Sequence, residues 1–170
     1  MNELEDLIAR RDLNKAFDDY ALGMDLRNVD RFLSAWTPDA VWEMNSAVGQ
    51  GVLRGTGHKE IEGVLRRLWT DEQLVQHTTA NHAIVFDDET HAHGDGHTTC
   101  HGVNGAGKFF FIGAVYPADR YEKVDGVWRI SFRRVECNVY AEFDPSELSD
   151  FQFFIGDGGA VGPEGLKQPI

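Results

Sequence analysis

The segment Tyr121-Glu-Lys-Val-Asp-Gly-Val-Trp-Arg129 places a turn dipeptide, Asp125-Gly126, between two stretches in which apolar and polar residues alternate. Asp-Gly favours the positive φ angles that tight β-hairpins need. Two further turn signals, Asp87-Asp88-Glu89 and Asn104-Gly105-Ala106-Gly107, precede it. The sequence therefore predicts a meander of long strands joined by hairpins. The expected strands are 75–86, 91–103, 108–123 and 127–140.

Upstream of Leu74 the apolar residues recur at helical spacing instead. This spacing predicts a first helix of about six turns that closes between Gly23 and Arg27. A short second helix follows, with Asn28 or Asp30 as its cap, and a third helix is expected over 61–69. A short strand, 40–45, and a glycine-rich loop, 46–57, lie between them. Helices first and a curved antiparallel sheet second is an α+β arrangement, with the helices on one face of the sheet.

The chain has 170 residues, of which 42% are hydrophobic and 11% aromatic, and this suits one domain with a sizeable core. We expect that domain over 1–145 and a tail over 146–170. The aromatic part of the tail, 151–155, is expected to dock on a neighbouring surface, and its end is expected to be flexible.

The formal net charge is −12, so nucleic acid and anionic membranes are not expected as partners. No apolar run approaches the roughly 20 residues that span a bilayer, and the segment Met1-Asn-Glu-Leu-Glu-Asp6 is acidic. A cytoplasmic protein is therefore expected. Cys100 and Cys137 form neither a disulfide framework nor a metal-ligand pattern, so buried free thiols are expected.

Asp25 closes the first helix beside its apolar stripe, which contains Phe17, Tyr20 and Met24. A buried carboxylate is costly unless another group pairs with it. Two interpretations stay open from the pattern alone. Asp25 either meets a partner in a pocket or caps the short helix that follows.

His77 lies on the first long strand, where the odd positions form a mixed face that suits a pocket wall. An imidazole placed there could act as a base near neutral pH, and a structural histidine is the alternative. His82 has the opposite parity and is predicted to be structural or exposed. The odd face of this strand also contains Asn81, a candidate substrate contact.

Four histidines follow on the next strand, at odd positions that place them on one face: His91, His93, His97 and His101. At ~3.3 Å per residue the first and last are about 33 Å apart, so they are not expected to share a metal ion. We expect His91 and His93 to be solvated. His97 and His101 are expected to run toward the pocket, with His101 the better candidate.

Arg133 and Arg134 have opposite parity, so only one of them can face the interior without a bulge. An inward Arg133 could stabilise a developing anion, whereas an outward one could pair with Glu122 or Glu136. Tyr20, on the first helix, could present its hydroxyl to the same cavity or be an ordinary core tyrosine. The remaining candidates for the cavity lining are Trp42, Met44, Leu68, Trp69, Asn81, Phe110, Ile112 and Phe143.

The order of elements and the segment 121–129 resemble the SnoaL-like branch of the cystatin-like, nuclear-transport-factor-2-like α+β barrels. The chain is most similar to the scytalone dehydratase and hexachlorocyclohexane dehydrochlorinase types. Asp25 in Gly-Met-Asp-Leu-Arg-Asn matches the family's helix-end acid, and His77 in Val-Gln-His-Thr-Thr-Ala-Asn matches the base with which it pairs. His101 matches a second histidine of the dehydratases, and Arg133 matches the catalytic arginine of the dehydrochlorinases.

The resemblance implies an enzyme that needs no cofactor or metal and assembles as a homotrimer or dimer. We expect a lyase in which His77, assisted by Asp25, takes a proton from a small hydroxylated, aromatic substrate that then loses water or formaldehyde. His101, Tyr20 or Arg133 would supply the acid or stabilise the anion. An isomerase or cyclase is an alternative. Another is a non-catalytic subunit resembling the β subunit of aromatic-ring dioxygenases, which predicts that Asp25 and His77 lie far apart or that the cavity is filled.

Overall fold

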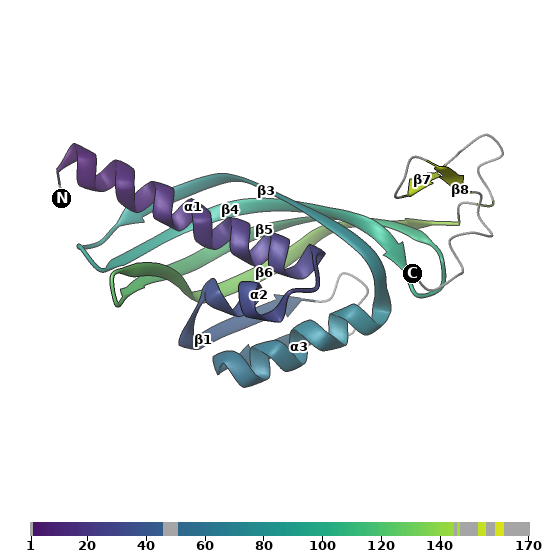
Figure 1. Cartoon of the computed structure of the whole chain (residues 1–170), viewed down its shortest axis with the longest axis horizontal. Coiled ribbons are helices and arrows are strands. Elements are labelled where there is room, and N and C mark those ends of the chain that lie inside the picture. Colours follow the sequence, from purple (N-terminus) through teal and green to yellow (C-terminus); the bar gives the residue numbers. More distant parts are fainter. Residues whose placement is uncertain (1, 46–50, 145, 147–152, 156–158, 162–170) are drawn as a thin grey trace.

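The computed structural model describes residues 2–45, 51–144, 146, 153–155 and 159–161 of the chain. Helices and a curved sheet form two layers, and α1 lies along one face of the sheet (Figure 1). The helices are α1 (Glu3–Asp25), α2 (Val29–Ser34) and α3 (Gly57–Asp71). The strands of the large sheet are β1 (Trp36–Asn45), β2 (Val52–Thr56), β3 (Glu72–Phe86), β4 (His91–Asn104), β5 (Phe109–Val124) and β6 (Val127–Phe143). This arrangement confirms the predicted α+β class.

The strands of the large sheet lie in the order β2-β1-β6-β5-β4-β3. Strands β3 to β6 form the predicted meander of antiparallel hairpins, with bounds close to those expected. β1 pairs with β6 in parallel, so the sheet is not wholly antiparallel. The predicted loop 46–57 is wrong in its second half, because β2 pairs with β1. Its first half, 46–50, lies outside the described residues.

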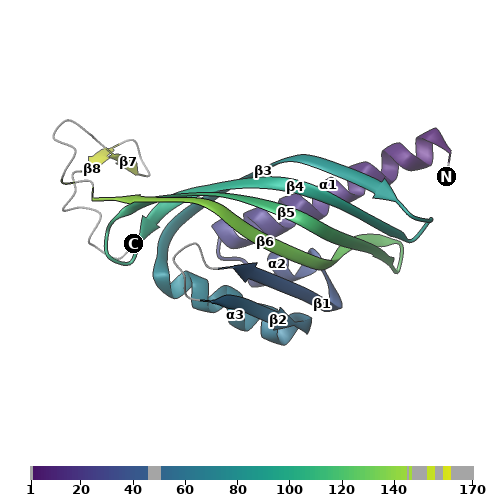
Figure 2. The same ribbon diagram turned by 180° about the vertical axis from the view of Figure 1, so that it is seen from behind.

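The helix α1 starts with a capping box. The Asn2 side chain accepts a hydrogen bond of 3.0 Å from the backbone N–H of Glu5, whose carboxylate accepts one of 2.8 Å from the backbone N–H of Asn2. The hydrophobic stripe that α1 buries consists of Ala9, Leu13, Ala16, Phe17, Tyr20, Ala21 and Met24. We call the sheet face that packs against α1 the inner face and the opposite one, which is in front in Figure 2, the outer face.

Bulges in β3, β5 and β6 change which residues face inward. In β3 the extra residue lies next to Asn81, whose φ of 57° is in the left-handed region. β5 carries its extra residue at Pro117-Ala118, and β6 carries one at Ser131-Phe132. A bulge exchanges the inward and outward positions beyond it, because side chains alternate along a strand. The polar residues that these bulges place on the inner face are His82, Asp119 and Arg133.

The tail is described at residue 146 and at the short strands β7 (Phe153–Ile155) and β8 (Gly159–Val161), which pair with each other. The predicted docking of 151–155 and the predicted flexible end fall largely outside the described residues. Both stay predictions, as does the boundary at residue 145. In the part of the chain that the structure describes, we find no helix with the length and apolar character needed to cross a membrane.

Candidate active site

Asp25, the last residue of α1, holds His77 of β3 through both oxygens of its carboxylate. Its Oδ1 lies 2.6 Å from the ring Nδ1, and its Oδ2 accepts a hydrogen bond of 2.9 Å from the backbone N–H of the same histidine. The His77 and Asp25 side chains are only 8% and 12% exposed. The contact fixes the orientation of the ring. In the neutral imidazole it places the proton on Nδ1, so Nε2 is the nitrogen that can accept a proton.

The short helix α2 has a different cap. The Asn28 side chain accepts a hydrogen bond of 3.0 Å from the backbone N–H of Arg31, in the first turn of α2. Both Asp25 oxygens are directed to His77 instead. Of the two interpretations that the sequence left open for Asp25, the structure shows the contact with a partner.

Close packing at the end of α1 fixes the position of Asp25. A Cβ at Gly23 would lie 2.5 Å from the backbone nitrogen of Phe32, so only glycine lets α2 pack this closely. From the other side, the indole Nε1 of Trp69 in α3 donates a hydrogen bond of 3.1 Å to the Met24 carbonyl. Asp25 therefore lies where the three helices meet, and a rigid position of this kind suits a residue that orients a base.

The electrostatics of the helix end also require a partner for Asp25. A carboxylate at a C-terminus faces the negative end of the helix macrodipole. The last turn of α1, which the structure describes fully, holds no basic residue. The two N–H groups of His77 therefore supply the compensation that the helix itself does not.

A second polar cluster on the inner face pairs Arg133 of β6 with Asp119 of β5, and both side chains are fully buried. The Arg133 Nε lies 3.1 and 3.0 Å from the two Asp119 oxygens, and Nη2 also donates to this carboxylate. The Tyr121 hydroxyl donates a hydrogen bond of 2.9 Å to the same group. The β6 bulge turns Arg133 inward, while the half-exposed Arg134 pairs with Glu43. The outward pairing of Arg133 considered in the sequence analysis is therefore wrong.

Aromatic rings enclose the Arg133 guanidinium. Its Cζ lies 5.3, 4.6 and 4.0 Å from the ring centroids of Phe17, Tyr20 and Tyr116. Burial, more than any other cause, raises the pKa of Tyr20 well above its usual value, so its hydroxyl remains a donor. Because Tyr20 and Asp25 both belong to α1, this helix contributes to both polar clusters.

His82 also belongs to the inner face, because the bulge at Asn81 reverses its parity. Its ring stacks on Phe17 with 3.7 Å between the centroids. Burial and, next, the positive charge of Arg133 lower the pKa of His82 to about 4, so the ring is neutral at pH 7. Its Nε2 has no hydrogen-bond partner among the described residues.

The β4 histidines lie on the outer face. His101 is in register with the exposed Gln76, whereas its neighbour Cys100 is in register with His77. The His101 ring stacks on Phe109 at 6.2 Å. The prediction that His97 and His101 approach the His77 pocket is therefore wrong. The alternate residues of β4 are the ones that face inward, and they are small or buried: Ala92, Gly94, Gly96, Thr98, Cys100 and Gly102. A Cβ at Gly94 or Gly102 would lie 2.1 or 1.9 Å from a backbone carbonyl oxygen of β3, and one at Gly96 would meet the rings of His82 and Tyr116.

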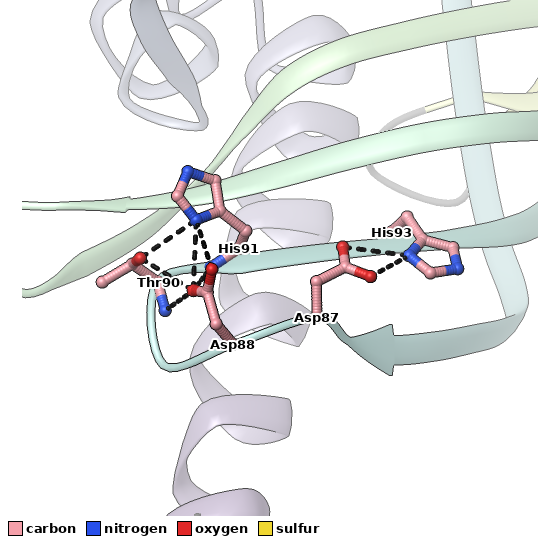
Figure 3. Close-up of polar contacts among 5 residues, drawn as sticks. All are labelled: Asp87, Asp88, Thr90, His91 and His93. Atoms are coloured by element: carbon pink, nitrogen blue, oxygen red, sulfur yellow. Dashed lines mark hydrogen bonds and ion pairs between the residues drawn. The ribbon is translucent and has the colours of Figure 1, made fainter.

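Two of these outer histidines pair with acids of the β3–β4 hairpin (Figure 3). The Nδ1 of His91 lies 2.9 Å from Asp88 Oδ2, and the Nδ1 of His93 lies 2.9 Å from Asp87 Oδ1. All four side chains are about half exposed. Within the described ranges no group of three or more histidine, cysteine or acidic residues is placed to hold a metal ion.

Most of the predicted lining residues are buried or partly buried against the core: Trp42, Met44, Leu68, Trp69, Phe110 and Ile112. Two are not brought near His77. Asn81 is exposed at the bulge, with its Nδ2 3.1 Å from the Nδ1 of His97. Phe143 packs on Phe109 at 4.9 Å, on the outer face. Both are therefore removed from the candidate lining.

Two features of the inner face were not predicted from the sequence: Asp119, which holds Arg133, and the inward placement of His82. A signal for Asp119 was present, since Pro117 lies inside an otherwise continuous strand and proline there marks a bulge. The inner face thus offers two kinds of chemistry. His77 can take up a proton, and Arg133 and Tyr20 can stabilise negative charge.

Comparison with known proteins identifies the family. A family model described as "SnoaL-like domain" matches residues 5–134. Hexachlorocyclohexane dehydrochlorinase 1 of Sphingobium indicum is 31% identical over 137 residues, which cover 77% of this chain and 82% of that protein. The gamma-hexachlorocyclohexane dehydrochlorinase of the same organism is 27% identical over 144 residues, covering 82% and 87%.

Solved structures are also similar to this chain. The crystal structure of a hexachlorocyclohexane dehydrochlorinase (LinA) of type 2 matches with a TM-score of 0.73 and 26% identity, covering 84% of this chain and 93% of that one. A putative scytalone dehydratase from Novosphingobium aromaticivorans matches with a TM-score of 0.70 over 82% and 90% of the two chains. At 20% identity the second match supports the fold alone.

Proposed function

The chain belongs to the SnoaL-like domain family, and we propose that within it this protein is a cofactor-independent lyase with His77 as its general base. The dehydrochlorinase relatives are lyases that eliminate hydrogen chloride. The observation that carries the proposal is the contact of Asp25 with both the ring Nδ1 and the backbone N–H of His77. A positioned base of this kind typically accelerates a reaction by about 10²–10⁴-fold.

In the proposed reaction, Nε2 of His77 removes a proton from a carbon or oxygen atom of the substrate. Asp25 stabilises the imidazolium that forms, and the bond to the leaving group then breaks. Arg133 would stabilise the negative charge that develops, through the Nη1 that Asp119 does not engage. The Tyr20 hydroxyl, which burial keeps protonated, would donate to the leaving group.

We propose a small hydroxylated substrate with an aromatic or alicyclic ring. Support comes from the aromatic side chains of the inner face, where Tyr20 and Trp42 meet edge to face at 6.1 Å. Water is the first leaving group to test, and formaldehyde from an aryl diol is the second. Chloride is the third, because it leaves in the reaction for which the relatives are named. Isomerisation or cyclisation would use the same proton transfers without a leaving group.

A non-catalytic accessory subunit is the rival function. That role predicts either that Asp25 and His77 lie far apart or that the cavity is filled. Their separation of 2.6 Å favours the enzyme.

The test is a mass-spectrometric screen of the purified protein with aryl alcohols, aryl diols, hydroxyketones and chlorinated cyclohexanes. We expect a product lighter than its substrate by the mass of water, formaldehyde or hydrogen chloride. His77→Gln should abolish most of this turnover. The matched control is His91→Gln, which removes a histidine that also pairs with an aspartate but lies on the outer face. Equal loss of turnover in both variants, or none in either, would contradict the role of His77.

A further inference from the structure

Asp119 neutralises Arg133 completely inside the protein. Both side chains have no exposed surface, and the carboxylate receives three donors, which are Nε and Nη2 of Arg133 and the Tyr121 hydroxyl. The two nitrogens of a cationic guanidinium and a hydroxyl donor all favour the ionised form of this group, so we treat Asp119 as the anion. The pair therefore brings no net charge to the inner face.

One N–H edge of the guanidinium is left over. Nη1 of Arg133 is buried and has no hydrogen-bond partner among the described residues. The Tyr116 ring lies 4.0 Å from the guanidinium Cζ and the Tyr20 ring 4.6 Å from it, so aromatic faces surround the group. A buried donor without a partner is costly, and a bound acceptor atom would satisfy it.

Other buried polar atoms lie around the same rings. The Nε2 of His82 has no hydrogen-bond partner within the described chain, and the Tyr116 hydroxyl lies within hydrogen-bonding reach of the Thr98 and Tyr20 hydroxyls. The rings of Tyr116 and His82 meet over Gly96, where a Cβ would lie 3.3 Å from one and 2.8 Å from the other. None of these groups carries a charge at neutral pH, because burial and Arg133 keep His82 in its neutral form. They add hydrogen-bonding capacity without changing the charge balance of the pair.

We propose that Asp119 determines the charge of the ligand: the free Nη1 edge of Arg133 takes a neutral acceptor, a carbonyl, hydroxyl or carbon-bound halogen, and rejects a carboxylate. An anion at Nη1 would place a second negative charge beside Asp119 with only one cation to share between them. Burial strengthens this repulsion, because water cannot screen it.

The inference rests on the proposed function and narrows its substrate class. A neutral acceptor gains negative charge only as the leaving group departs or an oxyanion forms. Arg133 would then interact more strongly with the transition state than with the bound substrate, and that difference accelerates a reaction. Asp119 acts here as a positioning residue, since it reaches the ligand only through Arg133.

The test compares benzamide with benzoate, which have nearly the same shape and differ in charge at pH 7.5. Isothermal titration calorimetry on the wild-type protein should show benzamide binding with a Kd of about 1 mM, as expected for a fragment of this size. Benzoate should bind about tenfold more weakly or not at all, since one unfavourable charge contact of this order is worth a factor of ten. Equal or tighter binding of benzoate, or no binding of benzamide up to its solubility limit, would overturn the proposal.

Asp119→Asn should reverse the preference, because it leaves Arg133 uncompensated. The ratio of the two dissociation constants should shift by at least about tenfold toward benzoate. Asp88→Asn, which removes the same charge from the exposed hairpin, should leave the ratio unchanged. Tyr121→Phe should also leave the ratio unchanged, because it retains the charges of both Asp119 and Arg133. If Asp119→Asn does not fold, the wild-type comparison still decides the question.

This outcome is separable from that of the proposed function. His77→Gln should lose turnover and yet keep the preference for benzamide, because it leaves Arg133 and Asp119 intact. Normal turnover without the preference would refute the inference alone. The preference without any effect of His77→Gln on turnover would refute the proposed function alone.

Discussion

The chain pairs histidine with aspartate in two very different regions. Under the end of α1, Asp25 and His77 are 12% and 8% exposed, whereas at the β3–β4 hairpin Asp88 and His91 are 55% and 56% exposed. The Nδ1–carboxylate contact is similar in both places, at 2.6 and 2.9 Å. The pair itself therefore does not mark a functional site, and the surroundings decide what it can do.

Enclosure changes the chemistry of the pair in two ways. Water competes for the exposed hairpin contacts, and such surface pairs contribute little to stability. The inner pair is held by a second hydrogen bond, from the His77 backbone to Asp25, and by the packing of three helices around the helix end. A base that is fixed in orientation and shielded from water can act on a substrate, whereas a solvated one exchanges protons with water.

The largest expected difference between the two regions is in activity. Asp25→Asn should lower turnover by about 10²–10⁴-fold, because an amide cannot both orient His77 and balance an imidazolium charge. Asp88→Asn makes the same chemical change at the exposed pair and should leave turnover within twofold. Steady-state rates on a substrate found by the screen measure both. If the two variants lose activity to the same extent, enclosure is not what distinguishes the pairs.

The loss of stability on mutation should also differ clearly between the buried and the exposed pair. Asp119→Ala leaves the Arg133 charge buried and unpaired, so the free energy of unfolding should fall by about 3–5 kcal/mol. Asp87→Ala, which breaks the exposed contact with His93, should change it by about 1 kcal/mol or less. Urea denaturation at pH 7 gives both values. A smaller loss for Asp119→Ala than for Asp87→Ala would show that the inner pair does not depend on its carboxylate.

The pH dependence of stability should reveal the half-buried His82, whose ring stacks on Phe17. Burial and Arg133 lower the pKa of His82 from 6.5 to about 4. Between these pH values the unfolded chain binds more protons than the folded one, so the free energy of unfolding rises with pH. Stability from this group is therefore present above pH 6.5 and lost as the pH falls toward 4. Thermal unfolding between pH 4 and 7 should show a shallower slope for His82→Phe than for the wild type, and His91→Gln should keep the full slope.

The smallest effects should come from the exposed pair itself. His93→Gln, and likewise His91→Gln, should leave the thermal midpoint at pH 7 and the turnover within experimental error, because water replaces the lost contact. Differential scanning fluorimetry and the activity assay check this. A large shift in the thermal midpoint would indicate that the hairpin contributes to the fold in a way that its exposure hides.

The periodic parts of the fold could be predicted from the sequence. The helical spacing before Leu74 and the alternation after it correspond to α1, α3 and the β3–β6 meander. The pairing of Asp25 with His77 was accessible through the family resemblance, because it depends on elements whose ends are well marked. β2 was not predicted, since Gly55 within it and the glycines on either side of it conceal a strand that pairing with β1 stabilises.

The composition of the inner face was harder to predict, because it depends on bulges. Alternation alone put His82 and Arg133 on uncertain faces and overlooked Asp119. His101 was placed on the wrong face for another reason. Polar and small residues alternate along β4, and the polar ones were expected to face inward. Those small residues mark the inward side, where the β3 backbone comes close to Gly94 and Gly102 and the His82 and Tyr116 rings lie over Gly96.

The bulge at Asn81 shifts the alternation of β3 by one residue, much as a one-base insertion shifts a reading frame. The residues stay the same, but inside and outside exchange from that point on. His77 lies before the shift and His82 after it, so an odd-numbered and an even-numbered histidine face the same interior. A deletion of Asn81 alone would leave the Asp25 contact in frame and turn His82 out to solvent. A change of one residue in the length of β3 would thus exchange the inward and outward positions over 82–86 without any substitution in that segment.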